Sequence, residues 1–181
     1  YIENAVSLFT SDELQKIKKK IRSVISKSNS QSSKDSFVIK SGNNPQLDAF
    51  REQRALLSKK LTWLELSERE ETKISSLKIG HSSVHGHYIE VSSSFKNKVP
   101  ETYRRKQTLK NAERYDINEL SEIDFKLNEV DTEIEKFEQQ IFSNLCGELK
   151  KSGGFLFEIS ENLGVIDTLL SLAQKIVRHN W

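Results

Sequence analysis

Hydrophobic residues recur at helical spacing through most of this 181-residue chain. The first run, residues 11–26, has its apolar positions at Leu14, Ile17, Ile21 and Val24. Intervals of three or four residues place these side chains on one face of a helix. Ser11 has a side chain suited to the N-terminal cap, so the run predicts a capped amphipathic helix.

A second helix is predicted to begin at Asn44 and Pro45, which suit the N-cap and the first helical position. Its apolar positions are Leu47, Phe50, Leu57, Leu61 and Leu64. Neither Gly nor Pro occurs between Pro45 and Gly80. About 28 residues can therefore form one helix of about 40 Å, at ~1.5 Å per residue.

A third helix is predicted from Asp116, which can cap it together with Glu119, to about Leu149. Its apolar residues come close to a heptad repeat, and they are Ile117, Leu120, Ile123, Leu127, Val130, Ile134, Phe137, Ile141 and Leu145. Two long helices joined by a structured insert pack most simply side by side and antiparallel, because each then covers the apolar face of the other.

The segment KKSGG, residues 150–154, predicts a break after the third helix. A final amphipathic helix follows, and its expected inward residues are Ile166, Leu169, Leu170, Ala173 and Val177. The polar, serine-rich residues 26–36 have no periodicity and predict a flexible loop without an assigned function.

Between the two long helices, residues 74–116 change from helical to alternating spacing. Leu77 and Ile79 are expected on one face of a strand, with Lys78 on the other. After a turn at Ser82 and Ser83, a second strand is expected to repeat this alternation. The segment YRRKQTL, which begins at Tyr103, predicts a further strand.

These elements predict a mainly α protein with a small β insert. The expected architecture is a long antiparallel helical hairpin that carries a small β-sheet at its tip. Three parts follow: residues 1–75 with the outgoing long helix, residues 76–116 with the sheet, and residues 117–181 with the returning helices.

Composition fits elongated, solvent-exposed helices, since charged residues make up 30% of the chain and hydrophobic residues 35%. One cysteine excludes an internal disulfide framework, and no apolar run is long enough to span a bilayer. We therefore expect a soluble, cytoplasmic protein with no membrane partner. The chain contains no methionine, so we expect a fragment of a longer protein; removal of an initiator by processing is the alternative.

Charge is concentrated in the β insert. Residues 77–115 contain eight basic and three acidic residues, whereas the whole chain has a formal net charge of only +2. Lys and Arg provide charge for phosphate groups, and neighbouring Thr and Asn side chains provide neutral hydrogen bonds. An ordinary solvated surface is the alternative explanation of such a charge run.

Other chemistry has weaker support. His81, His85 and His87 are close in sequence, but no Asp or Cys accompanies them nearby, so no metal site is assigned. Cys146 follows apolar helix positions and is expected to be a packing residue. The chain has no GxxxxGK[ST] phosphate-binding loop, and no catalytic residue is predicted.

Two segments resemble a known family. LKIGHSSVHGHYIEV, residues 77–91, and VPETYRRKQTLKNAERY, residues 99–115, are similar to runs in the clamp and lever region of the MutS family of bacterial DNA mismatch-repair proteins. The clamp is the sheet-containing tip, and the levers are the long helices that carry it. Weaker similarity extends over most of the chain, although only loosely over the first 36 residues.

The resemblance implies a non-enzymatic module that binds the backbone of double-stranded DNA without reading its sequence. In the longer parent it would couple the state of an ATPase to gripping of DNA. The implied DNA-binding residues are Lys78, Arg105, Thr108, Lys110, Asn111 and Arg114. This fragment would hold no cofactor, whereas the full-length parent would use ATP and Mg²⁺, form a homodimer, act on mismatched duplex and meet a MutL-type repair partner.

This chain departs from the family pattern at several positions. Ser82 stands where the family commonly has Asn, His87 where it has the first Tyr of a pair, and Asn118 where Pro is frequent. Gly153 and Gly154 interrupt what is usually one helix in the family. The departures at Ser82 and His87 put the contacts of that turn in doubt. A coiled-coil module whose basic hairpin binds a protein partner is the alternative function.

Overall fold

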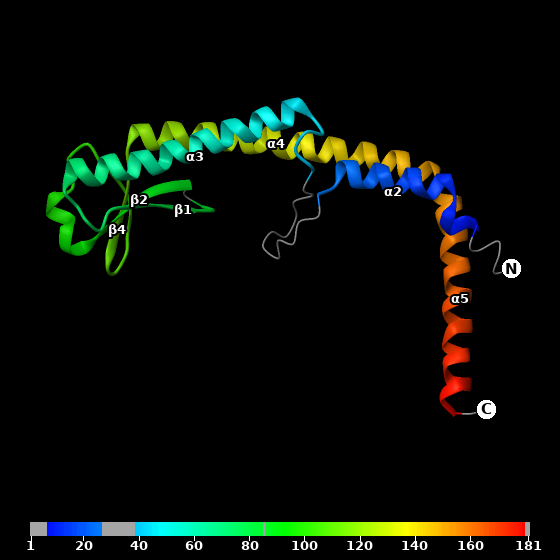
Figure 1. The fold of residues 1–181 in the computed structure, drawn as a ribbon. Helices are drawn as coiled ribbons and strands as arrows, with labels where there is room; N and C mark the ends of the chain where they lie inside the picture. Colours follow the sequence, from blue (N-terminus) through cyan, green and yellow to red (C-terminus); the bar gives the residue numbers. More distant parts are fainter. Residues whose placement is uncertain (1–6, 27–38, 85, 180–181) are drawn as a thin grey trace. The chain divides into compact units, whose positions relative to one another are not determined.

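The computed structural model describes residues 7–26, 39–84 and 86–179, and it confirms a mainly helical protein with a small antiparallel sheet (Figure 1). The helices are α2 (Asp12–Val24), α3 (Pro45–Thr72), α4 (Asn118–Lys151) and α5 (Gly153–His179). The strands are β1 (Lys78–Ser82), β2 (Gly86–Ser92), β3 (Arg104–Thr108) and β4 (Ala112–Asp116), with a 3₁₀ helix η1 (Ser93–Lys98) after β2.

The chain forms two compact units. One comprises Asn44–Phe137 and contains α3, the sheet and the first part of α4. The other comprises Tyr1–Asn43 together with Glu138–Trp181. The division of the chain into residues 1–75, 76–116 and 117–181, which rests on the sequence pattern, stays a prediction.

Helix α3 begins as its sequence predicts. The Asn44 side-chain oxygen accepts hydrogen bonds from the backbone N–H groups of Gln46, at 2.8 Å, and Leu47, at 3.1 Å. Pro45 occupies the first turn, where its missing N–H is not needed. The helix runs for 28 residues to Thr72, and the C-cap residue Lys73 has a left-handed φ of 56°, which ends the helical geometry.

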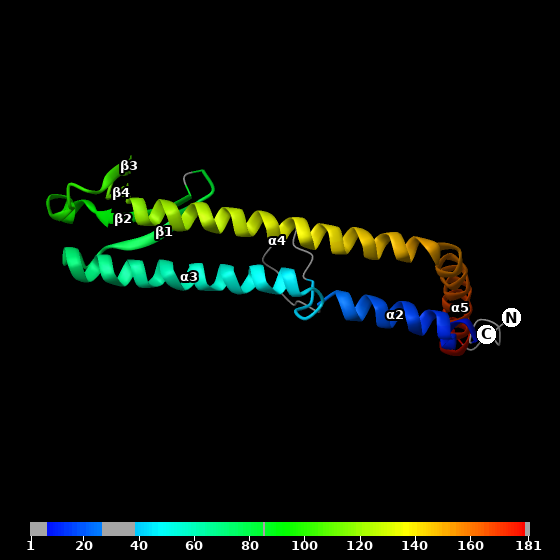
Figure 2. The same cartoon turned by 90° about the horizontal axis from the view of Figure 1, so that it is seen from above.

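Helices α3 and α4 pack antiparallel within the Asn44–Phe137 unit, in agreement with the sequence prediction. Phe50, near the start of α3, stacks at 5.7 Å between ring centroids on Phe137 of α4. Arg54, one turn later, pairs at 2.5 Å with Asp131, which precedes Phe137 on α4. As residue numbers rise along α3, those of its partners fall along α4; Figure 2 shows the two helices from above.

The four strands form an antiparallel sheet in the order β1-β2-β4-β3. In the register, Ile79 of β1 lies opposite Ile89 of β2, and Ile89 lies opposite Tyr115 of β4. This face of the sheet joins the hydrophobic core of α3 and α4, in which Leu64 and Leu120 are buried. A small sheet cannot be stable alone, so burial of this face on the helices stabilises it.

Side chains of α3 also hold the edge strand. Arg69 donates two hydrogen bonds to the fully buried carbonyl of Leu77, from Nε at 3.1 Å and from Nη2 at 2.7 Å. The same guanidinium pairs with Glu65 at 2.7 Å, and Glu65 accepts the N–H of Ile79 at 2.8 Å. The pair therefore satisfies backbone groups at the start of β1.

Helix α4 also contacts the sheet, at the start of β2. The Asp124 carboxylate accepts the backbone N–H of His87 at 3.2 Å and contacts the His87 ring Nδ1 at 2.5 Å. Gly86 adopts a φ of 66°, and a Cβ atom there would lie 2.3 Å from an Asp124 oxygen. Glycine at this position therefore permits both the left-handed backbone and the close approach of α4.

In the second unit, two sequence predictions are confirmed and one is wrong. Ser11 caps α2 by accepting the N–H of Leu14 at 3.3 Å, as predicted. The predicted break also occurs, because α4 ends at Lys151 and α5 begins at Gly153. The expected inward face of α5 is wrong: Ile166 is half-buried, and the other residues of that set, Leu169, Leu170, Ala173 and Val177, are exposed. Within the described chain, no helix or strand covers them.

Two sequence predictions concern other parts of the chain. The serine-rich loop falls almost wholly at residues 27–36, outside the described residues. Among the helices of the described ranges, none combines the length and the apolar character needed to cross a bilayer.

Replacement of Arg69 by Ala tests how the edge strand is held. The change leaves the buried Leu77 carbonyl without both donors, so we expect the free energy of unfolding to fall by about 1–3 kcal/mol. Urea unfolding followed by far-UV circular dichroism measures this. Lys59→Ala, an exposed change on the same helix, serves as the control, and an equal effect of both changes would contradict the role of Arg69.

Candidate nucleic-acid interface

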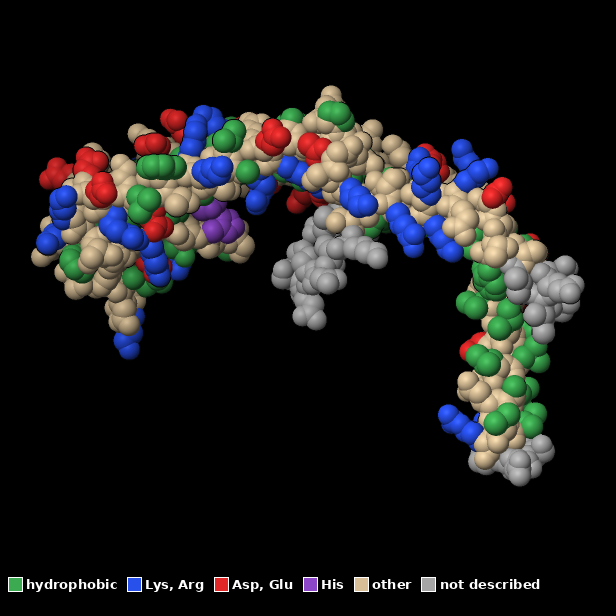
Figure 3. All heavy atoms as spheres, in the orientation of Figure 1, with side chains coloured by type: hydrophobic (Ala, Val, Ile, Leu, Met, Phe, Trp, Pro, Cys, Tyr) green, Lys and Arg blue, Asp and Glu red, His purple; other side chains and the backbone are tan. Residues whose placement is uncertain are grey.

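Basic side chains gather on the sheet and its connections, with acidic side chains among them (Figure 3). Six of the cations are arranged around three carboxylates, two to each. The three carboxylates are Glu90, Glu113 and Asp116, and the six cations are Lys78, Lys96, Arg104, Arg105, Lys106 and Arg114.

The first set follows from the strand register. Lys78, Glu90 and Arg114 are direct cross-strand partners on β1, β2 and β4, so their side chains share one face. Glu90 pairs with Lys78 at 3.0 Å and with Arg114 at 3.1 Å. The hydrogen bond from Lys78 is the main reason that the pKa of Glu90 is lowered, and Arg114 adds to this effect.

Arg114 is the most sheltered of the predicted DNA-binding cations, because its side chain is only 22% exposed. Its guanidinium lies 4.1 Å from the ring centroid of Tyr88 and donates a 2.9 Å hydrogen bond to Gln107. These contacts join β2, β4 and β3. Arg114 therefore stabilises the sheet as well as contributing positive charge.

The second set surrounds Glu113, which is buried at the opposite face of the sheet. Its carboxylate pairs with Lys96 of η1 at 2.9 Å and with Arg105 of β3 at 3.1 Å, and it accepts a 2.6 Å hydrogen bond from the Tyr115 hydroxyl. This hydroxyl is the largest cause of the lowered pKa of Glu113, followed by Lys96. Burial raises the pKa of Tyr115, and the neighbouring Glu113 raises it further.

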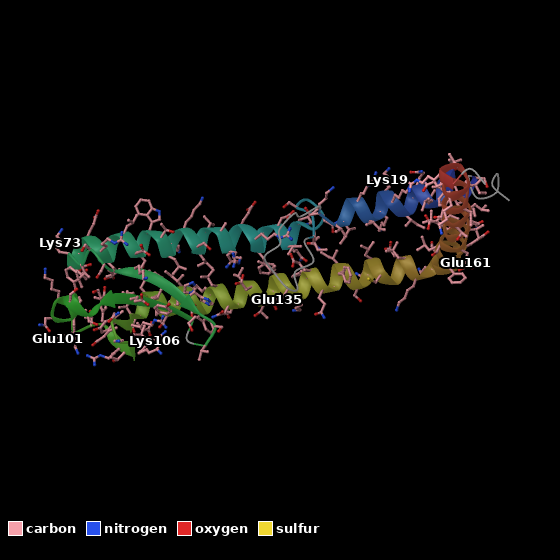
Figure 4. The ribbon with its side chains drawn as sticks, turned by 90° about the horizontal axis from the view of Figure 1, so that it is seen from below. Lys19, Lys73, Glu101, Lys106, Glu135 and Glu161 are labelled. Carbon is pink, nitrogen blue, oxygen red and sulfur yellow. The ribbon has the colours of Figure 1, made fainter. Side chains whose placement is uncertain are left out.

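The third set surrounds Asp116 at the end of β4. Arg104 approaches this carboxylate at 3.0 Å and Lys106 at 3.7 Å, while the Ser121 hydroxyl lies 2.8 Å from each oxygen. Lys106 also donates to the His87 carbonyl at 3.2 Å, and Figure 4 labels it beside the sheet. The register of β3 shifts between Arg105 and Gln107, which makes Lys106 the extra residue of a bulge.

In these sets the carboxylates are sheltered and most of the cations are exposed. The Arg105 side chain is 52% exposed, whereas the Glu113 carboxylate beneath it is 5% exposed. Two cations against one carboxylate leave each set with an excess positive charge at the surface. An incoming phosphate would therefore meet ammonium and guanidinium groups that the carboxylates already hold in position.

The turn between β3 and β4 presents a different kind of group. Thr108, Lys110 and Asn111 are all exposed. The turn is held by two backbone hydrogen bonds, from Leu109 to the Ala112 carbonyl at 2.9 Å and from Ser93 to the Asn111 carbonyl at 3.1 Å. Figure 1 shows this hairpin directed away from α3, which leaves its end open to a large partner.

The structure does not bring all six predicted residues onto one face. Lys78 and Arg114 share one face, and Arg105 lies on the other, because Arg105 is opposite Tyr115 in the register. Lys110 and Asn111 lie in the turn at one end of the β3–β4 hairpin. A single flat surface cannot contact the whole set, so the assignment of all six residues to DNA stays a prediction.

Sequence reasoning missed the pairing of the cations. Lys96, Arg104 and Lys106 were counted as charge but were not assigned to a site, although each pairs with a carboxylate. Alternation along β4 carried a signal, because Glu113 and Tyr115 fall on one face and Arg114 on the other. The contribution of Lys96 had no such signal, since it comes from the 3₁₀ helix that follows β2.

The histidines have structural contacts. The rings of His81 and His87 lie 4.7 Å apart, because the two residues are cross-strand partners, and His87 also contacts Asp124. Ser82 accepts the N–H of Val84 at 3.3 Å in the turn that follows β1. His85 lies outside the described residues, and among those that are described no group of three His, Cys, Asp or Glu side chains could hold a metal ion.

Comparison with known proteins relates this geometry to one family. Residues 42–133, which include β1 to β4 and the cation sets, match the sequence model described as MutS family domain IV. The DNA mismatch repair protein MutS of Thermotoga neapolitana is 44% identical over 144 residues, which cover 80% of this chain and 18% of that protein.

Two further relatives show the same relationship. The DNA mismatch repair protein MutS of Trichodesmium erythraeum is 34% identical over 168 residues, or 93% of this chain and 19% of that protein. The protein of the same name from Thermus caldophilus is 36% identical over 80% of this chain and 18% of its own length. The chain thus spans less than a fifth of the length of these curated relatives.

Acid unfolding tests the buried carboxylate of the second set. The pKa of Glu113 is lowered in the folded protein, so its contribution to stability is present above the ordinary glutamate pKa of about 4.3. That contribution is lost as the pH falls through the lowered value, because the unfolded chain then binds more protons. We expect Glu113→Gln to lower the thermal midpoint at pH 7 and to reduce its further fall between about pH 5 and pH 3.

Glu101→Gln removes an exposed carboxylate near the same sheet and serves as the control. Thermal unfolding by circular dichroism across the pH series gives the comparison. If the midpoint of Glu113→Gln falls with pH as steeply as that of the unsubstituted chain, the buried carboxylate does not have this role.

Proposed function

This chain belongs to the MutS family and contains its domain IV, the clamp region, and on that premise we propose that it binds the sugar-phosphate backbone of double-stranded DNA. The proposal concerns contact without sequence reading. Phosphate contacts position a protein on the duplex, whereas side chains that enter a groove read the bases. The candidate cations come from strands, a 3₁₀ helix and a turn.

The arrangement of two cations around each sheltered carboxylate is the observation that supports this proposal best. A guanidinium or ammonium that is already held by a carboxylate loses little side-chain freedom when it meets a phosphate. The excess positive charge of each set provides the attraction, and the exposed Lys110 adds an unshielded charge at the hairpin turn. Such binding depends strongly on salt, because phosphate contacts release counterions.

The long helices support a mechanical role as levers. Helix α3 has 28 residues and α4 has 34, which correspond to about 42 Å and 51 Å at ~1.5 Å per residue. A stiff helix carries a small rotation at one end to a large displacement at the other, whereas a flexible linker would absorb it. We propose that the longer parent uses this property to couple ATP state to gripping of DNA.

Other properties of the longer parent belong to the same proposal. We propose that this chain itself is not an enzyme and holds no cofactor, and that ATP and Mg²⁺ bind elsewhere in a full-length homodimer. We also propose that the parent acts on mismatched duplex in the cytoplasm together with a MutL-type partner. Two copies of the clamp on one duplex would add to affinity through effective concentration.

A salt titration of duplex binding tests the proposed function. About four phosphate contacts predict a slope near −4 in a plot of log affinity against log salt concentration, with similar values for matched and mismatched duplex. Lys78→Gln and Lys110→Gln should each reduce the size of the slope by about one unit if the lysine meets a phosphate. Fluorescence anisotropy with a labelled duplex measures this, and circular dichroism confirms unchanged helicity.

Lys136→Gln provides the matched control, because Lys136 is exposed on α4 and distant in sequence from the sheet. Its slope should equal that of the unsubstituted chain. Absence of duplex binding at low salt would contradict the proposal and favour the alternative of a protein-interaction module. Equal slopes for all three variants would show that a different surface meets DNA.

Removal of an internal carboxylate, in contrast to removal of a lysine, is predicted to strengthen duplex binding. Glu90→Gln removes the carboxylate that positions Lys78 and Arg114 but leaves their charge uncompensated. We expect the gain in attraction to outweigh the loss of positioning, so that duplex binding tightens by about two- to fivefold at low salt. This corresponds to an exposed charge interaction of about 0.4–1 kcal/mol. Glu101→Gln changes the net charge equally but does not face these cations. If both variants tighten binding equally, net charge rather than local pairing governs affinity.

A further inference from the structure

A second surface of the Asn44–Phe137 unit lies on its helices, apart from the sheet. Helix α3 buries Leu57 and Leu64 against the core but leaves Leu56 59% exposed and Trp63 73% exposed. Leu56 and Trp63 are seven residues apart, so they lie on one face of the helix. Exposed tryptophan is uncommon on soluble proteins and is enriched at protein interfaces.

These apolar side chains form a hollow of about 570 Å³, within the roughly 300–1,000 Å³ typical of binding pockets. The residues that line it are Gln53, Leu56, Leu57, Lys59, Lys60, Trp63 and Lys126. All of its charged residues within the described part of the chain are lysines. Two come from α3, between Leu56 and Trp63, and Lys126 comes from α4.

The neighbouring hollow has the opposite charge. Phe50 and Phe125 contribute to its lining, together with the carboxylate side chains of Glu129 and Glu133. Exposed apolar side chains alone would therefore not distinguish this hollow from the one at Trp63. The three lysines distinguish the Trp63 hollow, because they favour a ligand that combines apolar groups with negative charge.

We propose that the Trp63 hollow is a docking site for an acidic amphipathic helix of a partner protein. Apolar side chains at helical spacing would cover the exposed Leu56 and Trp63, and flanking carboxylates would meet Lys59, Lys60 and Lys126. The exposed apolar side chains favour a peptide over nucleic acid, because a phosphate backbone would use the lysines but leave Leu56 and Trp63 uncovered. Hydrophobic and basic side chains lie next to one another over α3 in Figure 3.

This site is separate from the cation sets of the sheet, so it goes beyond the proposed DNA binding. The test uses the whole chain and a panel of fluorescein-labelled amphipathic peptides. In every peptide, Leu or Phe recurs at intervals of three or four residues; the other positions are rich in Glu in one half of the panel and rich in Lys in the other. Fluorescence anisotropy measures the affinity of each peptide.

We expect saturable binding of Glu-rich peptides and none of Lys-rich peptides. Leu56→Ala combined with Trp63→Ala should weaken binding at least tenfold, and Lys59→Glu combined with Lys60→Glu should do the same through charge alone. Phe157→Ala removes another exposed aromatic side chain, on α5, and should change nothing. All four positions are exposed, and circular dichroism checks that helicity is retained.

Three results would overturn the proposal. The first is the absence of binding by every Glu-rich peptide, and the second is equal binding of Lys-rich peptides. The third is a different occupant of the hollow. This would be shown if the chain binds a single-stranded oligonucleotide, or self-associates in analytical ultracentrifugation, and the Leu56 and Trp63 double variant abolishes that binding or self-association. The result of a duplex titration has no bearing on any of these outcomes, so this proposal and the proposed function can fail separately.

Discussion

The four-stranded sheet has to bury one of its faces, and the rest of the Asn44–Phe137 unit depends on how it does so. The sheet has short strands, of five to seven residues, and too little apolar surface to be stable alone. It packs Ile89, Val91 and Tyr115 into a core shared with Leu64 and Leu120 of the two long helices. This packing gives the strands a fixed register, because a slip of one residue would turn the apolar side chains outward.

The fixed register in turn determines the electrostatics. Once Ile79, Ile89 and Tyr115 face the core, Lys78, Glu90 and Arg114 must lie together on the opposite face. At the core-facing side, the buried Glu113 needs partners, and Lys96, Arg105 and Tyr115 supply them. Among the described side chains, no buried polar atom lacks a hydrogen-bond partner. The sheltered carboxylates beneath the exposed cations are therefore fully paired.

Helix side chains complete this arrangement at the edges of the sheet. Glu65 and Arg69 hold the backbone of β1, and Asp124 holds the start of β2. Tyr103 donates a 2.5 Å hydrogen bond to Glu68 of α3, and burial beside that carboxylate raises the pKa of Tyr103. Motion of the sheet relative to these helices would break several partly buried hydrogen bonds, so the sheet and the adjoining helix ends are expected to move together.

The sequence by itself was sufficient for the long helices, for the presence of a small sheet between them and for the family, but not for β4 or the strand order. Helical spacing, the Asn44–Pro45 start and the glycines after Lys151 are local signals; α3 and α4 begin and end within a few residues of the predicted positions, and α5 begins at the predicted break. Alternation at Leu77, Ile79, Ile89 and Val91 was equally local. The resemblance of residues 77–91 and 99–115 to the MutS family agrees with the later match over residues 42–133.

Tertiary structure decided which charges are paired and which apolar side chains stay exposed. The strand order β1-β2-β4-β3 brings Lys78, Glu90 and Arg114 together from three separate strands, and periodicity within one strand cannot reveal such a contact. Apolar spacing on α5 predicted an inward face, but burial requires a partner element, and the described chain has none there. Leu56 and Trp63 likewise remain exposed because the core takes Leu57 and Leu64, on the neighbouring face of α3. Spacing identifies the face on which a side chain lies, but long-range packing determines what that face meets.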